Sequence, residues 1–278
     1  MNSEIIGLTD WLKTPPGAYL LAWEQSHFDE AVSDIFGYHA LQLGLPELDA
    51  LQANRMPHKW LAQTGLQARA ATFAAQGYPL NGRAADSISS TRAALLADSA
   101  ALPFAEGSLD LVILPHTLEL GRDPHSALSE VARVLVPEGR VVISGFNPAS
   151  LWGLRQRRAH LYQRFGYGEP FLPEAGEYIG YWRLRDWLRL LNFEVESAHF
   201  GCYRPALASQ PWLDRFDWMD KAGKRWWPIF GAVYFLVAVK RVRGMRLLEP
   251  GCNARKAPAP AAIAVANKEP ASRATPQR

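Results

Sequence analysis

The sequence predicts an α/β protein: an open, mostly parallel sheet of seven strands with helices on both faces and an antiparallel strand at one edge. Three observations support this. Residues 109–143 follow a strand, helix, strand order, and residues 184–196 join a helical repeat to an alternating strand pattern. The chain has 278 residues, 48% of them hydrophobic and 21% charged, which suits a protein that buries a substantial core.

The N-terminal part begins with a predicted helix over residues 17–35, after the break at Pro15 and Pro16. A short apolar run at 38–43 ends before Gly44 and indicates the first strand. Residues 59–63 suggest a second strand and residues 92–97 a third, which ends at Asp98. The spacing predicts that these strands alternate with helices.

The middle of the chain carries the clearest pattern. Residues 109–114 form an apolar strand, and Asp123 followed by Pro124 predicts a helix start, because the aspartate can cap the free amides. The sequence Pro-Glu-Gly at 137–139 is expected to stop this helix and turn the chain into a β-branched strand at 141–143.

In the C-terminal part, apolar residues recur at helical spacing over 184–191, and Asn192 is placed to close that helix. The runs 193–203 and 232–242 predict an antiparallel strand pair. We therefore expect one domain over residues 1–249, with a core at 38–146 and a C-terminal part at 147–249. The Ala-, Pro- and Lys-rich residues 250–278 indicate a disordered tail.

Composition restricts the location and the partners. The formal net charge is only +3, which does not demand a nucleic acid or an anionic membrane. Cys202 and Cys252 form no disulfide framework, and no metal-ligand spacing is present, so we predict no metal site. The chain starts without a basic leader and apolar run, and the apolar run 226–239 is too short for a membrane span. These features favour a cytoplasmic protein.

The expected architecture fixes where a ligand would bind. Open parallel sheets bind ligands outside the carboxyl ends of their strands, near the point where strand order reverses. The predicted site therefore lies just past Leu43, Ala97 and Leu114.

The stretch 96–114 (LADSAALPFAEGSLDLVIL), followed by Asp123-Pro124 and by 132–143 (ARVLVPEGRVVI), resembles class I S-adenosylmethionine-dependent methyltransferases of the type-11, UbiE-like kind. The stretches ISGFNP at 143–148, DWL at 186–188 and LNFEV at 191–195 further resemble the YafS-like bacterial branch. The resemblance implies a Rossmann-like fold, S-adenosyl-L-methionine as cofactor, and a small-molecule methyl acceptor.

The resemblance also assigns cofactor contacts. In this family an acidic residue at the end of the third strand meets the adenine amino group, a role that falls on Asp98. The full set that the resemblance implies for the cofactor is Gln42, Gly44, Gln63, Asp98, Ser99, Ala100, Leu114 and Pro115. On the residues alone, Asp98 could equally close the turn that follows it.

Two positions depart from the family pattern. The first loop should read acid, then Gly-x-Gly-x-Gly, so that bare backbone can approach the cofactor. Here Gln42 replaces the acid, and Pro46 and Leu48 stand where the later glycines are expected. At the end of the second strand, Gln63 or Thr64 replaces the acid that the family uses for the ribose hydroxyls.

His116 follows the fourth strand, where the family places groups beside the methyl acceptor. As a neutral imidazole near its ordinary pKa it could take the acceptor's proton, which makes it the candidate catalytic residue, with Glu119 a weaker one. It could equally be a helix cap or a solvated side chain. Asp110 is expected to have a structural partner in the turn before it.

Three functions remain open. The leading one is methyl transfer, with residues 151–182 and 204–228 shaping substrate choice. The alternative is a non-catalytic methyltransferase-like binding or regulatory module, suggested by the departures above. The third is contact with nucleic acid or a membrane surface, suggested by basic residues beside Trp226 and Trp227. We interpret that mixture instead as a solvated basic face over an aromatic-rich core.

Overall fold

The computed structural model describes residues 7–63, 95–163, 170–173 and 176–241. Its centre is a seven-stranded sheet in the order β3-β2-β1-β4-β5-β7-β6. The strands are β1 (His39–Leu43), β2 (His58–Gln63), β3 (Leu95–Leu96), β4 (Leu109–Pro115), β5 (Leu135–Phe146), β6 (Phe193–Gly201) and β7 (Val233–Lys240). The helices are α1 (Leu8–Leu12), α2 (Pro15–Ser33), α4 (Thr117–Leu120), α5 (Pro124–Val134), α6 (Leu151–Gln163), α7 (Tyr181–Leu190), α8 (Gln210–Arg215) and α9 (Trp218–Trp226), with the 3-10 helix η1 (Pro228–Phe230).

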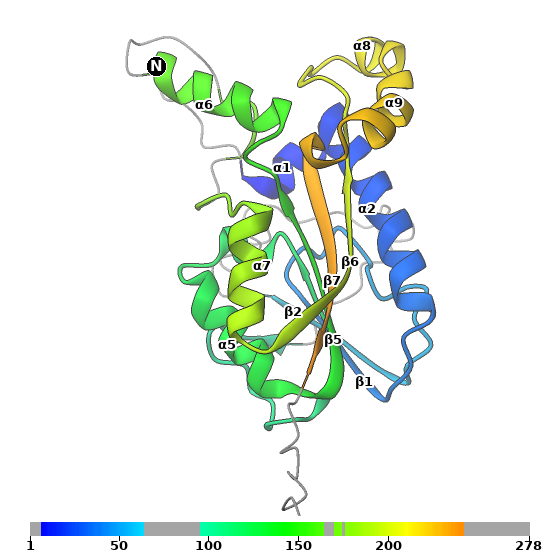
Figure 1. Cartoon of the computed structure of the whole chain (residues 1–278), viewed down its shortest axis with the longest axis vertical. Helices are drawn as coiled ribbons and strands as arrows, with labels where there is room; N and C mark the ends of the chain where they lie inside the picture. The colour runs from blue at the N-terminus through cyan, green and yellow to red at the C-terminus, as the bar shows by residue number, and fades with distance from the viewer. Residues whose placement is uncertain (1–6, 64–94, 164–169, 174–175, 242–278) are drawn as a thin grey trace, which may run out of the picture. The chain divides into compact units, whose positions relative to one another are not determined.

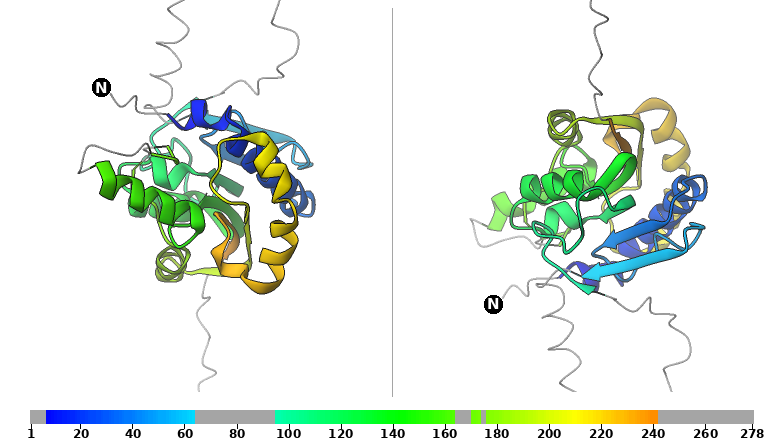
Figure 2. Two further views of the ribbon diagram at one scale, coloured as in Figure 1. Left: turned by 90° about the horizontal axis from the view of Figure 1, so that it is seen from above. Right: turned by 90° about the horizontal axis from the view of Figure 1, so that it is seen from below.

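The predicted fold class is confirmed. Strands β1 to β5 pair in parallel, while β7 pairs antiparallel with both β5 and β6. The antiparallel strand thus lies one place inside the edge, and β6 forms the edge itself. Figures 1 and 2 show α2 on one face of the sheet and α5 with α7 on the other. Each face has its own hydrophobic core.

Most predicted elements form where the pattern places them. Strands β1, β2 and β4 and the helix α2 lie within or close to the predicted ranges. Asp123 caps α5, because its Oδ1 accepts from the amides of His125 and Ser126 at 3.0 and 3.2 Å. Asn192 closes α7 in the left-handed region, at φ 62°. The predicted disordered tail lies outside the described residues.

The predicted stop of α5 at residues 137–139 is wrong. The helix ends at Val134, and Leu135 already has the extended φ of −71° and ψ of 139°. Residues 137–139 instead bend the chain inside β5, where Glu138 takes φ 63° and the pairing with β4 shifts register. Pro137 keeps Val136 out of the helical region and cannot donate to the helix, so α5 cannot reach residues 137–139. The carbonyls of Arg133 and Val134 accept instead from the amides of Gly107 and Ser108.

Asp110 is structural, but its predicted partner is wrong. Its Oδ2 accepts from the main-chain amides of Tyr38 and His39, at 2.8 and 2.9 Å, rather than from the turn before β4. A Cβ at Gly37 would lie 2.5 Å from the Asp110 Cβ, so glycine allows this close approach. The carboxylate therefore anchors the start of β1 to β4, across more than seventy residues of sequence.

We expect Asp110→Ala to lower the free energy of unfolding by about 2 kcal/mol, because two charge-assisted hydrogen bonds at the start of β1 are lost. Urea unfolding measures this. The exposed Glu106, in the turn before β4, provides the control, and Glu106→Ala should change the same free energy by less than about 0.5 kcal/mol. Equal losses in the two variants would contradict the anchoring role.

Candidate functional site

The carboxyl ends of β1, β2 and β3 meet at one edge of the sheet. Strand register places Leu43 beside Ala62, and the amide of Gly44 donates to the Ala62 carbonyl at 2.7 Å. The amide of Ala97 donates to the carbonyl of Gln63 at 3.0 Å. The predicted positions after these strands are therefore brought together, as expected for a sheet of this kind.

The turn after β3 exposes a carboxylate at this edge. The Asp98 Oδ1 accepts from the amide of Ala100 at 3.1 Å, and the amide of Ala101 donates to the Asp98 carbonyl. The Asp98 residue is nevertheless exposed, while Ser99 beside it is buried. The predicted turn closure is thus present, and the carboxylate also faces solvent at the end of β3. Gln63 ends β2 half-buried, and Thr64 lies outside the described residues.

The loop after β1 is organised by Gln42. Its side chain is buried, and its Nε2 lies within hydrogen-bond distance of the carbonyls of Gly44, Leu45 and Leu48 at 3.3, 3.0 and 2.6 Å. Its Oε1 accepts from the amide of Ala50 at 3.0 Å. A carboxylate could not donate to these carbonyls, so the amide is what this loop requires. The Gln42 side chain shapes the loop from inside.

The same loop belongs to the hydrophobic core. Gly44 has φ 87° and Leu45 has φ 45°, and this turn directs Leu45 inward. Leu45 and Leu48 are almost fully buried and pack in the cluster that contains Leu20 and Phe28 of α2. Of the two positions where the family pattern has later glycines, Leu48 therefore fills the interior, while Pro46 is only half-buried.

No helix lies between β1 and β2 in residues 44–57, all of which the structure describes. A cofactor with an anionic group is commonly held at the start of the helix that follows the first strand, where free amides point at the ligand. Here only turns connect the strands. At the edge formed by β2 and β3 the exposed Asp98 carboxylate can accept hydrogen bonds, whereas the loop after β1 lacks the helix start that commonly holds the anionic end of such a cofactor.

The chain after β4 turns at His116. Leu114 and Pro115 are buried in the strand, and His116 adopts φ 52° and ψ 10°, a left-handed conformation that costs a residue with a side chain about 1 kcal/mol. The Thr117 hydroxyl donates to the Leu43 carbonyl and so ties this turn to the end of β1. The strained turn is therefore fixed by its surroundings.

His116 stands between two buried carboxylates. Its Nδ1 lies 3.0 Å from Oε2 of Glu119, and its Nε2 lies 3.0 Å from Oε1 of Glu24 on α2. The Glu119 Oε1 accepts from the amide of Phe146 at 2.5 Å, which links the group to the end of β5. We call Glu24, His116 and Glu119 the buried charge cluster.

The cluster favours a charged imidazole. Burial by itself lowers the pKa of His116, but the attraction of Glu24 and the hydrogen bond with Glu119 outweigh it and raise the pKa of His116 to about 10. Burial raises the pKa of Glu119. The expectation of a neutral His116 near its ordinary pKa is therefore wrong, because the two carboxylates hold the proton on the ring. The alternatives of a solvated side chain or a side-chain helix cap also fail, since His116 is buried and makes no cap hydrogen bond.

Sequence reasoning missed Glu24, although a signal was present. Leu20, Glu24, Phe28 and Val32 recur every four residues along α2, and all four are buried. A carboxylate within an apolar stripe is costly unless a partner compensates it. Neither Glu24 oxygen has a hydrogen-bond partner among the described residues, so the contact with His116 is an ion pair without hydrogen-bond geometry.

Among the described residues, no group of three or more histidine, cysteine, aspartate or glutamate side chains is arranged to hold a metal ion. No helix there is long and apolar enough to cross a membrane. Cys202 is buried and makes no disulfide, and Cys252 lies outside the described residues.

Comparison with known proteins supports the resemblance seen in the sequence. Residues 56–143 match the model of a methyltransferase domain family. The matched range begins at Met56, near the end of the loop that follows β1, and so leaves out Gly44, Pro46 and Leu48. The chain is also 44% identical over 102 residues to the uncharacterized protein YafS of Escherichia coli K12, an alignment that spans 37% of this chain and 40% of that protein.

Solved structures show the same fold. One is a chain of the complex between the Haloferax volcanii Trm112 methyltransferase activator and a methyltransferase, with 16% identity, a TM-score of 0.52, and coverage of 87% of this chain and 99% of that one. Another is a SAM-dependent methyltransferase of Thermotoga maritima, with 14% identity, a TM-score of 0.50, and coverage of 80% and 93%. Identities this low show the fold alone.

We expect the free energy of unfolding to fall as pH rises from 6.5 toward 10, because the folded state holds the His116 proton that the unfolded chain has released. The total fall due to His116 should be roughly 3–5 kcal/mol. Glu119 acts in the same direction at lower pH, since its pKa is also raised by folding. Urea unfolding across this pH range measures the effect.

The variant His116→Gln should lose most of this pH dependence, while His125→Gln, at an exposed histidine, should keep it. The same pH dependence in all three proteins would show that His116 carries no extra proton in the fold.

We expect Gln42→Glu, which restores the family's acid, to lower the free energy of unfolding by about 3 kcal/mol or more, because a carboxylate would face buried carbonyl oxygens. Thermal and urea unfolding measure this. Gln63→Glu makes the same chemical change at a half-buried strand end and should cost less than about 1 kcal/mol. A stable Gln42→Glu protein would contradict the role given to the amide.

Proposed function

We propose that this chain transfers a methyl group from S-adenosylmethionine to a small-molecule acceptor. The premise is its class I methyltransferase domain of the type-11 family. The family implies this cofactor. When bound, it supplies an electrophilic methyl group on a sulfonium centre. In-line displacement of this kind depends mainly on holding the acceptor close to the methyl group and aligned with the bond that breaks.

The observation that supports the proposal is the edge formed by β2 and β3. Asp98 presents an exposed carboxylate there, and Gln63 lies on the neighbouring strand, joined to Ala97 by a main-chain hydrogen bond. We assign Asp98 to the adenine amino group, with Ser99 and Ala100 beside the ring and Gln63 toward the ribose. Both strands lie in the range that matches the family model.

The remaining assigned positions have different tasks. Gly44 starts the loop that Gln42 shapes, so we place Gly44 nearest the cofactor and give Gln42 an indirect role. Leu114 and Pro115 end β4 in the core and would form an apolar floor. The segments that contain α6, α8 and α9 would enclose the acceptor, as residues 151–182 and 204–228 were expected to do.

His116 is proposed as a positioning residue rather than the general base. Each of its ring nitrogens faces a carboxylate, so neither is available to take a proton from an acceptor. Through Glu119 it holds the amide of Phe146, and through Glu24 it holds α2. We infer that the buried charge cluster keeps the ends of β4 and β5 in place at the floor of the site.

A second function is favoured by a specific observation. Pro46 and Leu48 stand where the family pattern has bare glycine, Leu48 fills the interior together with Leu45, and residues 44–57 contain no helix. A chain that had lost the cofactor would keep the fold through this core. The second candidate is therefore a non-catalytic methyltransferase-like module with a binding or regulatory role.

Isothermal titration distinguishes the two candidates. We expect S-adenosylmethionine and S-adenosylhomocysteine to bind saturably, and Asp98→Ala to weaken both by roughly ten- to a hundredfold, the value of one charge-assisted hydrogen bond. Asp186→Ala, at an exposed carboxylate on α7, should leave the affinity unchanged.

Absence of binding to the folded protein at millimolar ligand would favour the non-catalytic module. Binding that Asp98→Ala does not weaken would keep the cofactor but overturn the assignment of its adenine contact.

A further inference from the structure

The segment from α8 to η1 exposes several large apolar side chains. Trp218 is 59% exposed and Trp226 is 71% exposed. The full set, which we call the tryptophan surface, is Trp212, Trp218, Trp226, Trp227, Ile229 and Phe230. The interpretation of an aromatic-rich core beneath a basic face is therefore wrong for this segment, because its tryptophans lie outside. Single exposed apolar residues are ordinary, whereas a cluster of this size marks a contact surface.

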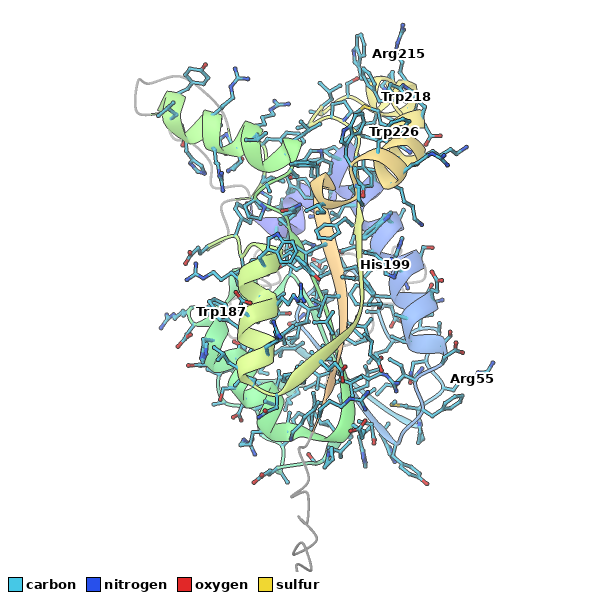
Figure 3. All side chains as sticks on the ribbon, viewed as in Figure 1. Arg55, Trp187, His199, Arg215, Trp218 and Trp226 are labelled. Carbon is cyan, nitrogen blue, oxygen red and sulfur yellow. The ribbon has the colours of Figure 1, made fainter. Side chains whose placement is uncertain are left out.

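Cations accompany these side chains. The exposed basic residues of the same segment are Arg215, Lys221, Lys224 and Arg225. Figure 3 shows Arg215, Trp218 and Trp226 at one end of the molecule. The segment also carries three carboxylates: Asp217 and Asp220 are paired with Arg204, and the exposed Asp214 accepts from Gln210. The outer surface is therefore apolar and basic together.

Helix α6 also exposes apolar and basic side chains. It exposes Leu151, Leu154, Leu161 and Tyr162 together with Arg157 and Arg158, and its sequence contains no carboxylate. Two contacts fix α6 to the loop between β6 and α8. The Trp152 Nε1 donates to the Arg204 carbonyl at 2.8 Å, and the Arg155 guanidinium donates to the Ala206 carbonyl. Figure 1 shows α6, α8 and α9 at the same end.

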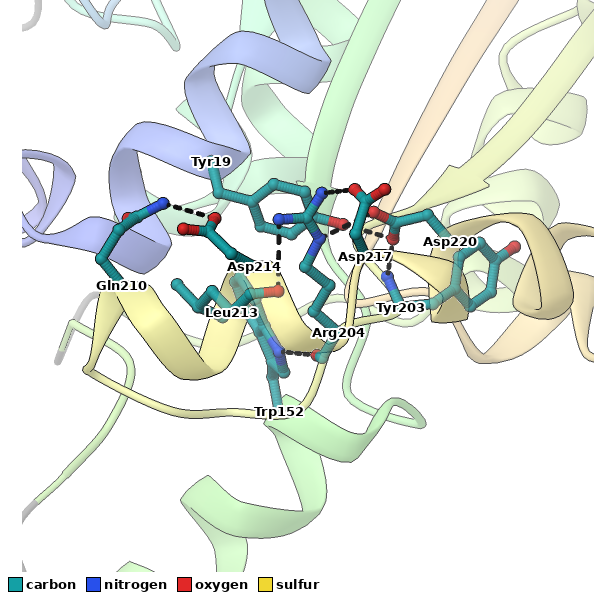
Figure 4. Close-up of polar contacts among 9 residues, drawn as sticks. All are labelled: Tyr19, Trp152, Tyr203, Arg204, Gln210, Leu213, Asp214, Asp217 and Asp220. Atoms are coloured by element: carbon teal, nitrogen blue, oxygen red, sulfur yellow. Dashed lines mark hydrogen bonds and ion pairs between the residues drawn. The ribbon is translucent and has the colours of Figure 1, made fainter.

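The outward tryptophans belong to a fixed part of the structure. Arg204 lies 4.3 Å from the Tyr19 ring centroid, and its Nε donates to Asp220 at 2.9 Å (Figure 4). The Tyr19 hydroxyl donates to the same carboxylate at 2.5 Å. These contacts anchor α9 to α2 from the inner side, so the tryptophan surface faces outward in a defined orientation.

We propose that the tryptophan surface and α6 dock on an anionic lipid bilayer. Tryptophan prefers the boundary between headgroups and acyl chains, and nearby lysine and arginine are attracted to anionic headgroups. Leu151, Leu154, Leu161 and Ile229 would enter the apolar boundary. Aliphatic side chains cannot stack on bases, so this mixture favours lipid over single-stranded nucleic acid. This proposal stands independently of methyl transfer.

Vesicle flotation tests the proposal with the full chain. Vesicles of phosphatidylcholine are compared with vesicles in which about a quarter of the lipid is phosphatidylglycerol, each at low and high salt. One variant is the double substitution Trp218→Ala with Trp226→Ala, and another is Lys224→Ala with Arg225→Ala. The control is Trp182→Ala on α7, because Trp182 is 58% exposed and so matches Trp218. Circular dichroism confirms that each variant is folded.

We expect the wild-type protein to float with the anionic vesicles and to bind less at high salt. Removing two cations should lower the partition coefficient by about 30-fold, from about 1 kcal/mol for each charge. In the double tryptophan variant the partition coefficient should fall at least roughly tenfold, because two amphipathic anchors are removed. Trp182→Ala should bind the vesicles as the wild type does.

Failure of the folded wild-type protein to float would overturn the proposal, as would equal losses in Trp182→Ala and the double tryptophan variant. Fluorescence anisotropy with a single-stranded oligonucleotide tests whether the same surface binds nucleic acid instead. Tryptophan-dependent binding there, without vesicle binding, would replace the lipid surface with a nucleic-acid surface.

Discussion

The ion pairing of His116 with Glu24 and Glu119 is the interaction on which the arrangement of the sheet end depends. It joins α2 to the turn after β4 and, through the Phe146 amide, to the end of β5. Buried charges are costly to desolvate, so removal of one partner would leave another charge uncompensated. The cluster therefore specifies one position of α2 over the sheet, and it supports the left-handed turn at His116.

Next to this cluster, the loop after β1 packs into the core, whereas the family pattern has glycine backbone facing the cofactor there. The Gln42 amide meets the loop carbonyls, while Leu45 and Leu48 pack with α2. Each change supports the other, because an inward leucine needs the turn that the amide holds. The neighbouring ends of β2 and β3 keep an exposed carboxylate, that of Asp98. The loop after β1 is thus filled by core side chains, while the turn after β3 leaves a carboxylate in solvent.

The C-terminal segments follow a different constraint. Arg204 and Trp152 fasten α6, α8 and α9 to the body from the inner side, where their partners are Asp220, Tyr19 and main-chain carbonyls. With the polar anchors turned inward, the tryptophans and lysines of this segment face outward. A basic aromatic sequence can thus form an exposed surface while the helices that carry it stay ordered.

The sequence by itself determined the order of strands and helices, because hydrophobic periodicity and capping residues such as Asp123 and Asn192 are local signals. It also carries the resemblance to the methyltransferase family, since the motif at 96–114 is contiguous. Only the tertiary structure decided the partners of Asp110, Gln42 and His116, which come from segments distant in the chain or from main-chain atoms. The tertiary structure also decided that Trp226 is exposed to solvent rather than buried in the core. A short amphipathic pattern does not say which face of the helix packs against the rest of the protein.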